Sequence, residues 1–282
     1  MHYSALFYGL STSSVPFTDS WHDYVLSDSI ILYEYIATKP LIFLFTTIAF
    51  VYVIYKALFM LTRIYQVESE KSSLSKYFSP QIAEEITKSG IELNHGKKQL
   101  VTILFQDIRN FTSLSESIST EELTEFLSEF RERMTKIIFK HSGSVDKYIG
   151  DAVMATFGTP TPKPNDAQNA ILASIDMIQS IRSWNQERVM ANKPPLKTGI
   201  GIHSGVVFAG NIGFADRMEY TVIGDAVNTA SRIEGLCKTY EADCILSEET
   251  RKLIQNFPTL PLPDTDVKGK GKPVQIHKLM ID

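Results

Sequence analysis

A stretch of 22 residues without an acidic side chain, Pro40 to Leu61, most strongly constrains how this chain can fold. Its sequence is PLIFLFTTIAFVYVIYKALFML, and its only charged residue, Lys56, lies near one end. A helix of about 20 apolar residues crosses a bilayer core of about 30 Å, and a lysine near the end of such a helix can extend its amine to the interface. We therefore predict one transmembrane helix over residues 40–61. The buried core helix of a soluble protein is the alternative.

Charged residues are distributed unequally on the two sides of this segment. In residues 1–39 acidic side chains dominate, and Lys39 is the only basic residue of the Lys or Arg type. Because basic segments are retained on the cytoplasmic side of a membrane, we predict that residues 1–39 form an extracytoplasmic segment and that the C-terminal part lies in the cytoplasm. The protein would then be a single-pass protein of the cell membrane. The basic residues within and after the span are Lys56, Arg63, Lys71 and Lys76.

Residues 62–96 are predicted to form a helical linker that is broken at Pro80. Their apolar residues are too sparse to indicate a coiled coil, so a solvated spacer and a connector that carries a signal both stay open. Residues 97–282 are predicted to form the globular domain. The chain of 282 residues, 44% hydrophobic and 21% charged, can bury one sizeable core. Its net charge of -4 indicates no nucleic acid partner, and we expect Cys237 and Cys244 to be reduced packing residues.

The globular part alternates between strand-like and helix-like patterns. The order strand, helix, two strands, helix, strand is that of a ferredoxin-like α+β fold, in which an antiparallel sheet carries helices on one face. Gly205 and Gly224 are expected to interrupt the chain between elements. The predicted elements are Val101–Phe105, Thr120–His141, the hairpin Val145–Phe157, Asp166–Met190, Lys197–His203, Val206–Ile212, Tyr220–Ile223, and a tail of short elements at Asp243–Leu246, Glu248–Ile254, Thr265–Val267 and Val274–Leu279.

Two acidic residues stand at the ends of predicted strands. Asp107 follows the apolar run Val101 to Phe105, and Asp151 lies in the Gly-Asp turn of the hairpin Val145 to Phe157. A carboxylate between buried strands needs a strong partner, and a divalent cation is a suitable one. If the two strands are neighbours, the acids could hold metal ions that clamp phosphates for in-line displacement. For Asp151, a turn residue that bonds to its own backbone is the alternative.

A second polar group lies on the helix predicted after Gly224. Asn228 and Arg232 are four residues apart, so they project from one side of that helix. An Asn and an Arg near a helix start beside a glycine turn suit the sugar and phosphates of a nucleotide, and an exposed polar face is the alternative. The basic loop Val267 to Lys272 could bind a triphosphate or form a solvated turn. It is no Walker loop, because GxxxxGK[ST] is absent.

Five motifs in the globular part carry a resemblance to a known family. They are FQDIRNF at Phe105–Phe111, VDKYIGDAVMATFG at Val145–Gly158, GIHSG at Gly201–Gly205, YTVIGDAVNTASR at Tyr220–Arg232 and VKGKG at Val267–Gly271. In this order they resemble the nucleotidyl cyclase catalytic domain of the class III adenylate and guanylate cyclases. The resemblance covers about two thirds of the chain, and YFSPQIAEEI at Tyr77–Ile86 resembles the connector that often precedes such domains. It implies the class III cyclase fold.

The resemblance also implies a metal site. Two divalent cations, Mg²⁺ or Mn²⁺, would be held by Asp107 and Asp151, with the carbonyl of Ile108 assisting. One ion would activate the 3'-hydroxyl group of ATP for in-line attack on the α-phosphorus. The other would hold the triphosphate and neutralise the leaving pyrophosphate.

The remaining site residues come from the other motifs. Arg232 matches the residue that stabilises the transition state, and Asn228 matches the residue that orients the ribose. Lys268 matches a residue that contacts the terminal phosphate, and Phe111, at the end of the first motif, is grouped with the substrate-binding residues. One departure concerns the phosphates: some family members have an Arg directly after the turn that ends at Gly205, where this chain has Val-Val.

Lys147 and Thr221 match the two purine-recognition positions of the family, where Lys with Asp or Thr goes with adenine. Lys147 can donate to adenine N1, whereas it would face the N1–H donor of guanine. That mismatch leaves a buried polar group unpaired. The resemblance therefore implies an adenylate cyclase, a phosphorus-oxygen lyase of intracellular signalling that uses ATP and releases cyclic AMP.

In this family the metal-binding acids come from one subunit, and the purine-recognition pair, the Asn and the Arg come from the other. This chain carries both sets, so the resemblance implies a head-to-tail homodimer with two equivalent sites. One membrane helix per chain would hold the two subunits at a high effective concentration. Three alternatives stay open: a guanylate cyclase, a silent nucleotide-binding module that reports through its membrane helix, and a polymerase-like palm, which the lack of a basic nucleic-acid track disfavours.

Overall fold

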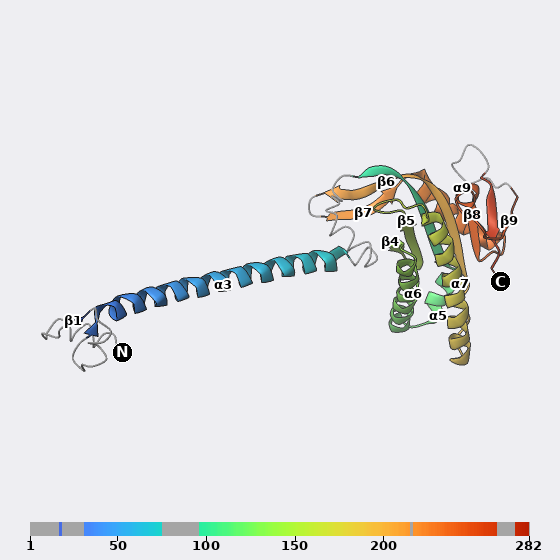
Figure 1. Ribbon diagram of the computed structural model, residues 1–282. Helices are drawn as coiled ribbons and strands as arrows, with labels where there is room; N and C mark the ends of the chain where they lie inside the picture. Colours follow the sequence, from blue (N-terminus) through green and yellow to red (C-terminus); the bar gives the residue numbers. More distant parts are fainter. Residues whose placement is uncertain (1–16, 19–30, 75–95, 215–216, 264–273, 282) are drawn as a thin grey trace. The chain divides into compact units, whose positions relative to one another are not determined.

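The computed structural model describes residues 17–18, 31–74, 96–214, 217–263 and 274–281, and its chain divides into two compact units, residues 1–68 and 69–282. The first unit contains the parallel pair β1 and β2 and most of the long helix α3. The second unit contains a sheet with helices (Figure 1). The elements are β1 Phe17–Thr18, β2 Ile31–Leu32, α3 Tyr33–Leu74, β3 Lys97–Ile108, α5 Phe111–Ser117, α6 Thr120–Lys140, β4 Ser144–Ile149, β5 Ala152–Phe157, α7 Asp166–Met190, β6 Thr198–Phe214, β7 Arg217–Ile223, α8 Asp225–Thr239, β8 Cys244–Ser247, α9 Glu248–Arg251, β9 Thr259–Pro261 and β10 Ile276–Leu279.

The predicted membrane span lies within α3. By length and composition, the 27 residues Lys39–Tyr65 can cross a membrane, since an 18-residue stretch within them has a mean hydropathy of 2.1 and is not buried inside the structure. The hydroxyl groups of Thr46 and Thr47 both donate to the carbonyl of Phe43, at 2.9 and 2.7 Å. The two hydroxyl groups are therefore satisfied within the helix, as a lipid environment requires.

The helix boundaries differ from the expected ones. α3 begins before Pro40 and continues without interruption to Leu74, so one helix covers the predicted span at residues 40–61 and the first part of the predicted linker at residues 62–96. Pro80, where the linker is predicted to break, lies outside the described residues. The division of the chain into an extracytoplasmic segment, a span, a linker and a domain stays a prediction.

An eight-stranded sheet forms the frame of the second unit. Its strands follow the order β4-β5-β3-β6-β8-β10-β9, and β7 pairs with β6. β3 lies antiparallel between β5 and β6, and β4 lies antiparallel to β5. With α6 and α7 as the connections between these four strands, the predicted ferredoxin-like arrangement is confirmed. β8 extends this sheet as a parallel neighbour of β6.

Apolar residues cover both faces of the sheet. On one face Leu104 of β3 belongs to the same buried cluster as Phe130 of α6 and Ile171 of α7. On the other face Ile103 of β3 belongs to a cluster with Ala230 of α8. Successive strand residues point to opposite faces, so the continuous apolar run at the centre of β3 requires cover on both sides. The prediction of helices on one face therefore holds for α6 and α7, whereas α8 covers the opposite face.

α8 packs directly on the backbone of β6. A Cβ atom on Gly201 would lie 2.2 Å from the backbone nitrogen of Glu234, and one on Gly205 would lie 2.7 Å from the Cβ of Ala226. Gly205 was expected to separate two strands, but β6 runs unbroken from Thr198 to Phe214. The expectation was wrong because a glycine within a strand can also mark the close approach of another element.

Most other predicted elements are confirmed. α6 and α7 match the two predicted helices, and β4 and β5 match the predicted hairpin. In the tail, β8, α9 and β10 match three of the predicted short elements, and residues 265–267 lie outside the described residues. α5 and β9 have no counterpart among the predictions. Cys237 and Cys244 are free and buried, as expected.

Replacing Gly201 with alanine should destabilise the protein by about 1–3 kcal/mol, because the added methyl group would overlap the backbone of α8. Gly235 is the matched control, since it lies in α8 and no described atom comes within 4 Å of its Cβ position. Gly235→Ala should leave stability unchanged or raise it by up to about 1 kcal/mol. Thermal unfolding of the full-length variants in detergent, followed by circular dichroism, measures both. Equal unfolding temperatures would contradict the close packing of α8 on β6.

Candidate active site

The structure brings Asp107 and Asp151 together at one end of two neighbouring strands. β3 carries Asp107 near its C-terminal end, and Asp151 immediately precedes β5, which is antiparallel to β3. The pKa of Asp107 is raised to about 6, first by burial and then by a hydrogen bond with the Asp151 carboxyl group and the charge of that group. The backbone amide of Ile108 donates to Asp107 Oδ1 at 2.9 Å. The two carboxyl groups therefore share one small, partly buried space.

A third acid, Glu234 of α8, lies close to this pair. Its pKa is raised to about 7, first by burial and then by the charge of Asp107, with a further contribution from Asp151, while Arg109 opposes the shift. The Glu234 Oε1 atom lies 2.7 Å from the position that a Cβ on Gly199 would take, and Gly199 pairs with Asp107 across the sheet. We did not predict Glu234, because its position on the helix carries no signal. The one signal that could have shown an element packing there is the group of glycines in β6, Gly199, Gly201 and Gly205.

The acidic cluster is chemically suited to a divalent cation. Carboxylate oxygens are the ligands that Mg²⁺ and Mn²⁺ prefer, and a cation would offset the burial and the neighbouring acids that together raise the pKa values of Asp107 and Glu234. Across the described part of the chain, no three His, Cys, Asp or Glu side chains converge as a ligand set. The carboxyl groups of Asp107 and Asp151 meet, so this pair fits a cation, and a contribution from the Ile108 carbonyl stays a prediction.

The turn that carries Asp151 is held by α6. Gly150 has a φ of 63°, a left-handed conformation that favours glycine. Arg131 Nη2 donates to the carbonyl of Gly150 at 2.8 Å, and its guanidinium group lies 4.9 Å from the centre of the Tyr148 ring. The hydroxyl groups of Tyr148 and Thr135 are hydrogen-bonded to each other. These contacts connect the tip of the hairpin to a helix whose other side is anchored in the core.

The structure also brings Lys147 and Thr221 together, through Asp146. Lys147 lies in β4 and Thr221 in β7, and β5, β3 and β6 come between these strands in the sheet. Thr221 Oγ1 donates to Oδ1 and Oδ2 of Asp146, at 2.9 Å each, and the backbone amide of Val222 donates to Oδ2 at 3.2 Å. Lys147 Nζ lies 3.4 Å from Asp146 Oδ1. One carboxylate thus contacts both predicted purine-recognition residues.

A bulge in β4 aims Asp146 at this contact. The register between β4 and β5 shifts between Val145 and Lys147, and a β-bulge of this kind changes the direction in which side chains point. Burial raises the pKa of Asp146, and the hydrogen bond from Thr221 opposes the shift. We did not predict Asp146, because a regular strand offers no reason to expect two adjacent residues, Asp146 and Lys147, at the same site.

Asn228 and Arg232 lie on the outer side of α8. Asn228 is exposed and Arg232 is half-buried, whereas Ala230 and Ile233 are fully buried against the sheet. Within the described ranges, no hydrogen bond or ion pair connects either polar side chain to the acid pair or to Lys147. The structure therefore leaves Asn228 and Arg232 available for contacts beyond their own chain.

The other predicted site residues fall in different places. Phe111 begins α5 and packs, half-buried, against the core on the α6 and α7 side. Lys268 lies outside the described residues. His203 is buried within β6, and its Nδ1 atom lies 2.8 Å from Ser247 Oγ, in keeping with a packing role. At the position where some family members have an Arg, Val206 is 65% exposed.

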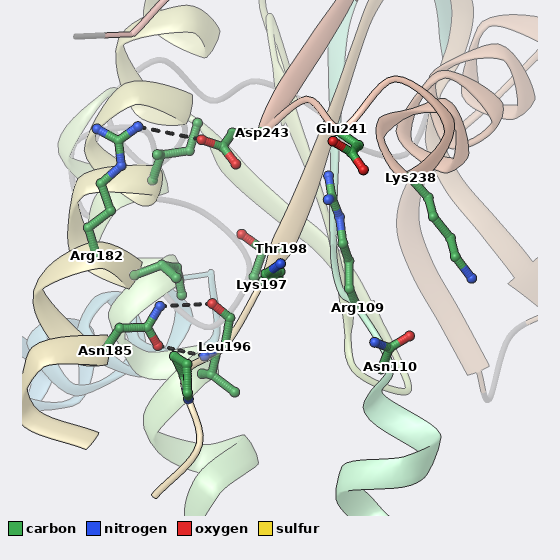
Figure 2. Close-up of a pocket in the computed structure, with 13 residues that line it drawn as sticks. Arg109, Asn110, Arg182, Asn185, Leu196, Lys197, Thr198, Lys238, Glu241 and Asp243 are labelled. Carbon is green, nitrogen blue, oxygen red and sulfur yellow. Dashed lines mark hydrogen bonds and ion pairs between the residues drawn. The ribbon is translucent and has the colours of Figure 1, made fainter. Parts of the chain in front are cut away.

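A pocket of about 730 Å³ lies beside the end of β3 and the start of β6 (Figure 2). Arg109 and Asn110 line it, together with residues of α7 and the segment after α8. Figure 2 shows the Arg182 side chain reaching toward Asp243, to which it is ion-paired at 3.5 Å. None of the predicted metal, purine-recognition or transition-state residues lines this pocket, so it is separate from the predicted nucleotide site.

Residues 93–280 match the family described as the adenylate and guanylate cyclase catalytic domain. An adenylate cyclase of Anabaena cylindrica is 41% identical over 189 residues, which are 64% of this chain and 36% of that protein. Adenylate cyclase 1 of Rhizobium meliloti (strain 1021) is 29% identical over 209 residues, 72% of this chain and 31% of that protein. The chain therefore spans about a third of the length of these curated relatives.

Solved structures of cyclases have the same fold. The adenylyl cyclase CyaB from P. aeruginosa is 36% identical, with a TM-score of 0.63 over 67% of this chain and 97% of that chain. The guanylyl cyclase Cya2 is 32% identical, with a TM-score of 0.57 over 65% of this chain and 93% of that chain. With its family match extending over residues 93–280, this chain belongs to the family of adenylate and guanylate cyclase catalytic domains.

Proposed function

We propose that this protein is a membrane-anchored, homodimeric adenylate cyclase that converts ATP to 3',5'-cyclic AMP and pyrophosphate. The observation that carries the proposal is the meeting of Asp107 and Asp151 at the ends of two neighbouring strands, in a chain of the cyclase family. The similarity to adenylate cyclases of Anabaena cylindrica and Rhizobium meliloti supports it.

Asp107 and Asp151, with the carbonyl of Ile108, would hold two divalent cations, Mg²⁺ or Mn²⁺. When bound, such cations lower the pKa of the attacking 3'-hydroxyl group and neutralise charge on the phosphates. Glu234, whose pKa is raised to about 7, is a third acid close to this pair, and its ionised form would be favoured by a bound cation. It would favour cation binding without being a ligand.

Arg232 and Asn228 would act on the nucleotide from α8. A guanidinium group aimed at the α-phosphate stabilises the charge that develops on its oxygens during the displacement, and the Asn228 amide would orient the ribose so that its 3'-oxygen lies in line with the leaving pyrophosphate. Lys268 and Phe111 remain predicted substrate-binding residues, Lys268 for the terminal phosphate.

Each active site would be shared between two chains. In one chain, as far as the structure describes it, the outer side of α8 makes no contact with the acid pair, which favours Asn228 and Arg232 serving the site of a second copy. The apolar helix segment Lys39–Tyr65 would anchor each copy in the cell membrane. The acidic N-terminal side and basic C-terminal side of that segment support a cytoplasmic catalytic domain.

The choice of ATP depends on Lys147 and Thr221. A guanylate cyclase is the second candidate, because the guanylyl cyclase Cya2 is similar to this chain to nearly the same extent as CyaB. The deciding experiment offers ATP and GTP side by side to the full-length protein in detergent with Mn²⁺. We expect cyclic AMP as the main product. Preferential turnover of GTP would overturn the choice of ATP, and nucleotide binding without turnover would favour a silent nucleotide-binding module.

Asp151→Asn should lower the rate of cyclic AMP formation by about 100-fold or more, because one metal ligand and its charge are lost. In the presence of a chelator, the same variant should unfold at a temperature no lower than the wild type, since the Asp107–Asp151 repulsion is removed. Asp243→Asn, in an exposed acid outside the site, is the control. A rate close to that of the wild type in Asp151→Asn would contradict the assigned metal site.

Coexpressed Asp107→Ala and Arg232→Ala chains should recover about a quarter of the wild-type activity, since half of randomly formed dimers are mixed and each has one intact site of two. Each variant alone should be inactive. Coexpressed Asp107→Ala and Asp151→Ala chains are the control, because both changes fall in the same half-site and no mixed dimer has an intact site. Failure of the first pair to recover activity would argue against sites shared between chains.

Arg131→Ala should raise the Mn²⁺ concentration that gives half-maximal activity by about tenfold, because loss of a group that orients a metal ligand weakens metal binding. The rate at saturating Mn²⁺ should be largely retained. Arg133→Ala, which removes a half-buried arginine of the same helix that pairs with Glu129 and Glu187, is the control. The same Mn²⁺ dependence in both variants would show that Arg131 does not position Asp151.

A further inference from the structure

The carboxylate of Asp146 receives only donors from the described part of the chain. Its side chain is 3% exposed, and it accepts hydrogen bonds from the Thr221 hydroxyl group and the Val222 amide. Lys147 contributes a positive charge 3.4 Å from Oδ1. These donors favour the ionised form of the carboxylate, against the effect of burial, which raises its pKa. Asp146 therefore determines how its neighbours direct their own hydrogen-bonding groups.

The accepting carboxylate of Asp146 restricts the Thr221 hydroxyl group, which has one hydrogen and two lone pairs. A threonine whose hydroxyl group rotates freely can donate to a carbonyl oxygen or accept from an amino group, so it does not distinguish the two. In this structure the hydrogen of the Thr221 hydroxyl group is directed to Asp146. Only the lone pairs of Thr221 Oγ1 then remain for a ligand.

We propose that Asp146 is a specificity-determining residue that fixes the Thr221 hydroxyl group as an acceptor and keeps Lys147 beside it as a donor. Adenine presents an acceptor at N1 and a donor at its 6-amino group, and guanine presents a donor at N1 and an acceptor at O6. A donor beside an acceptor therefore complements adenine at both positions and opposes guanine at both. The inference deepens the proposed function and rests on it, since it requires that Lys147 and Thr221 contact the base.

The burial of Thr221 makes this arrangement selective. Thr221 is 7% exposed, so water has little access to replace a missing partner, and a mismatched base would leave buried polar groups unpaired. A site built on such groups discriminates far more strongly than an apolar pocket of the same shape. Asp146 would act through Thr221 and Lys147, without contacting the base itself.

The first test needs no variant. The wild-type, full-length protein in detergent with Mn²⁺ is offered ATP, purine riboside triphosphate, inosine triphosphate and GTP, and kcat/KM is measured for each. Purine riboside triphosphate keeps the N1 acceptor and lacks the amino group, so its kcat/KM should be about tenfold below that of ATP. Inosine triphosphate has a donor at N1 and an acceptor at O6, so its kcat/KM should be lower still. Equal kcat/KM for ATP and purine riboside triphosphate would overturn the inference.

The second test is Asp146→Asn, which keeps the shape of the side chain. The amide can donate to Thr221 Oγ1, and the hydroxyl hydrogen of Thr221 is then free to point at the base. The ratio of kcat/KM for ATP to that for GTP should fall about tenfold or more. Thr221→Ser, which keeps the hydroxyl group, should preserve the wild-type ratio. In a Thr221→Val background Asp146→Asn should change the ratio less than it does in the wild type, because only the effect through Lys147 remains.

The outcomes separate this inference from the proposed function. No turnover of any of the four triphosphates by the wild-type protein would overturn the proposed function and the inference with it. Turnover of ATP with an unchanged ATP to GTP ratio in Asp146→Asn would overturn the inference alone. A change of the same size in the Thr221→Val background would also overturn it, because Asp146 would then not act through the Thr221 hydroxyl group.

Discussion

The contact between α8 and the backbone of β6 sets the geometry of the whole site. β6 has no side chain at Gly199, Gly201 and Gly205, so α8 can lie directly on the backbone of the strand. This close approach places Glu234 beside Asp107 on the inner side of α8. On the outer side, the same helix presents Asn228 and Arg232 away from its own acid pair. A larger residue in β6 would displace both sets at once.

Two carboxylates with opposite requirements lie on this frame. Asp107 is crowded by other acids, so its charge is poorly compensated in the protein alone, and its environment is suited to a cation. Asp146 is more deeply buried, yet donors from β4 and β7 surround it. Asp107 would be stabilised by a bound cation. Asp146 already has its donors, and it orients the Thr221 hydroxyl group and the Lys147 amine. Their different surroundings explain how two aspartates of one sheet, Asp107 of β3 and Asp146 of β4, can serve different purposes.

The features that were predicted correctly depend on residues close together in sequence. The apolar run of β3, the stripes of α6 and α7 and the Gly150–Asp151 turn are local patterns with known periods, and the strand ends that carry Asp107 and Asp151 follow from them. Gly205 was misjudged because a strand break and a close packing contact select the same residue type. Glu234 was missed because its neighbours in sequence do not reveal which part of the sheet its helix covers.

The sequence by itself determined the apolar segment within α3, the ferredoxin-like order of elements, and the identity of the acid pair and of the Asn-Arg pair. Each of these depends only on residue type and on spacing along the chain. Only the tertiary structure decided which side chains meet. Asp146 reaches Thr221 although three strands separate β4 from β7 in the sheet, and a bulge in β4 aims its side chain there. Contacts between residues distant in sequence arise from packing of the whole sheet, and no local pattern encodes them.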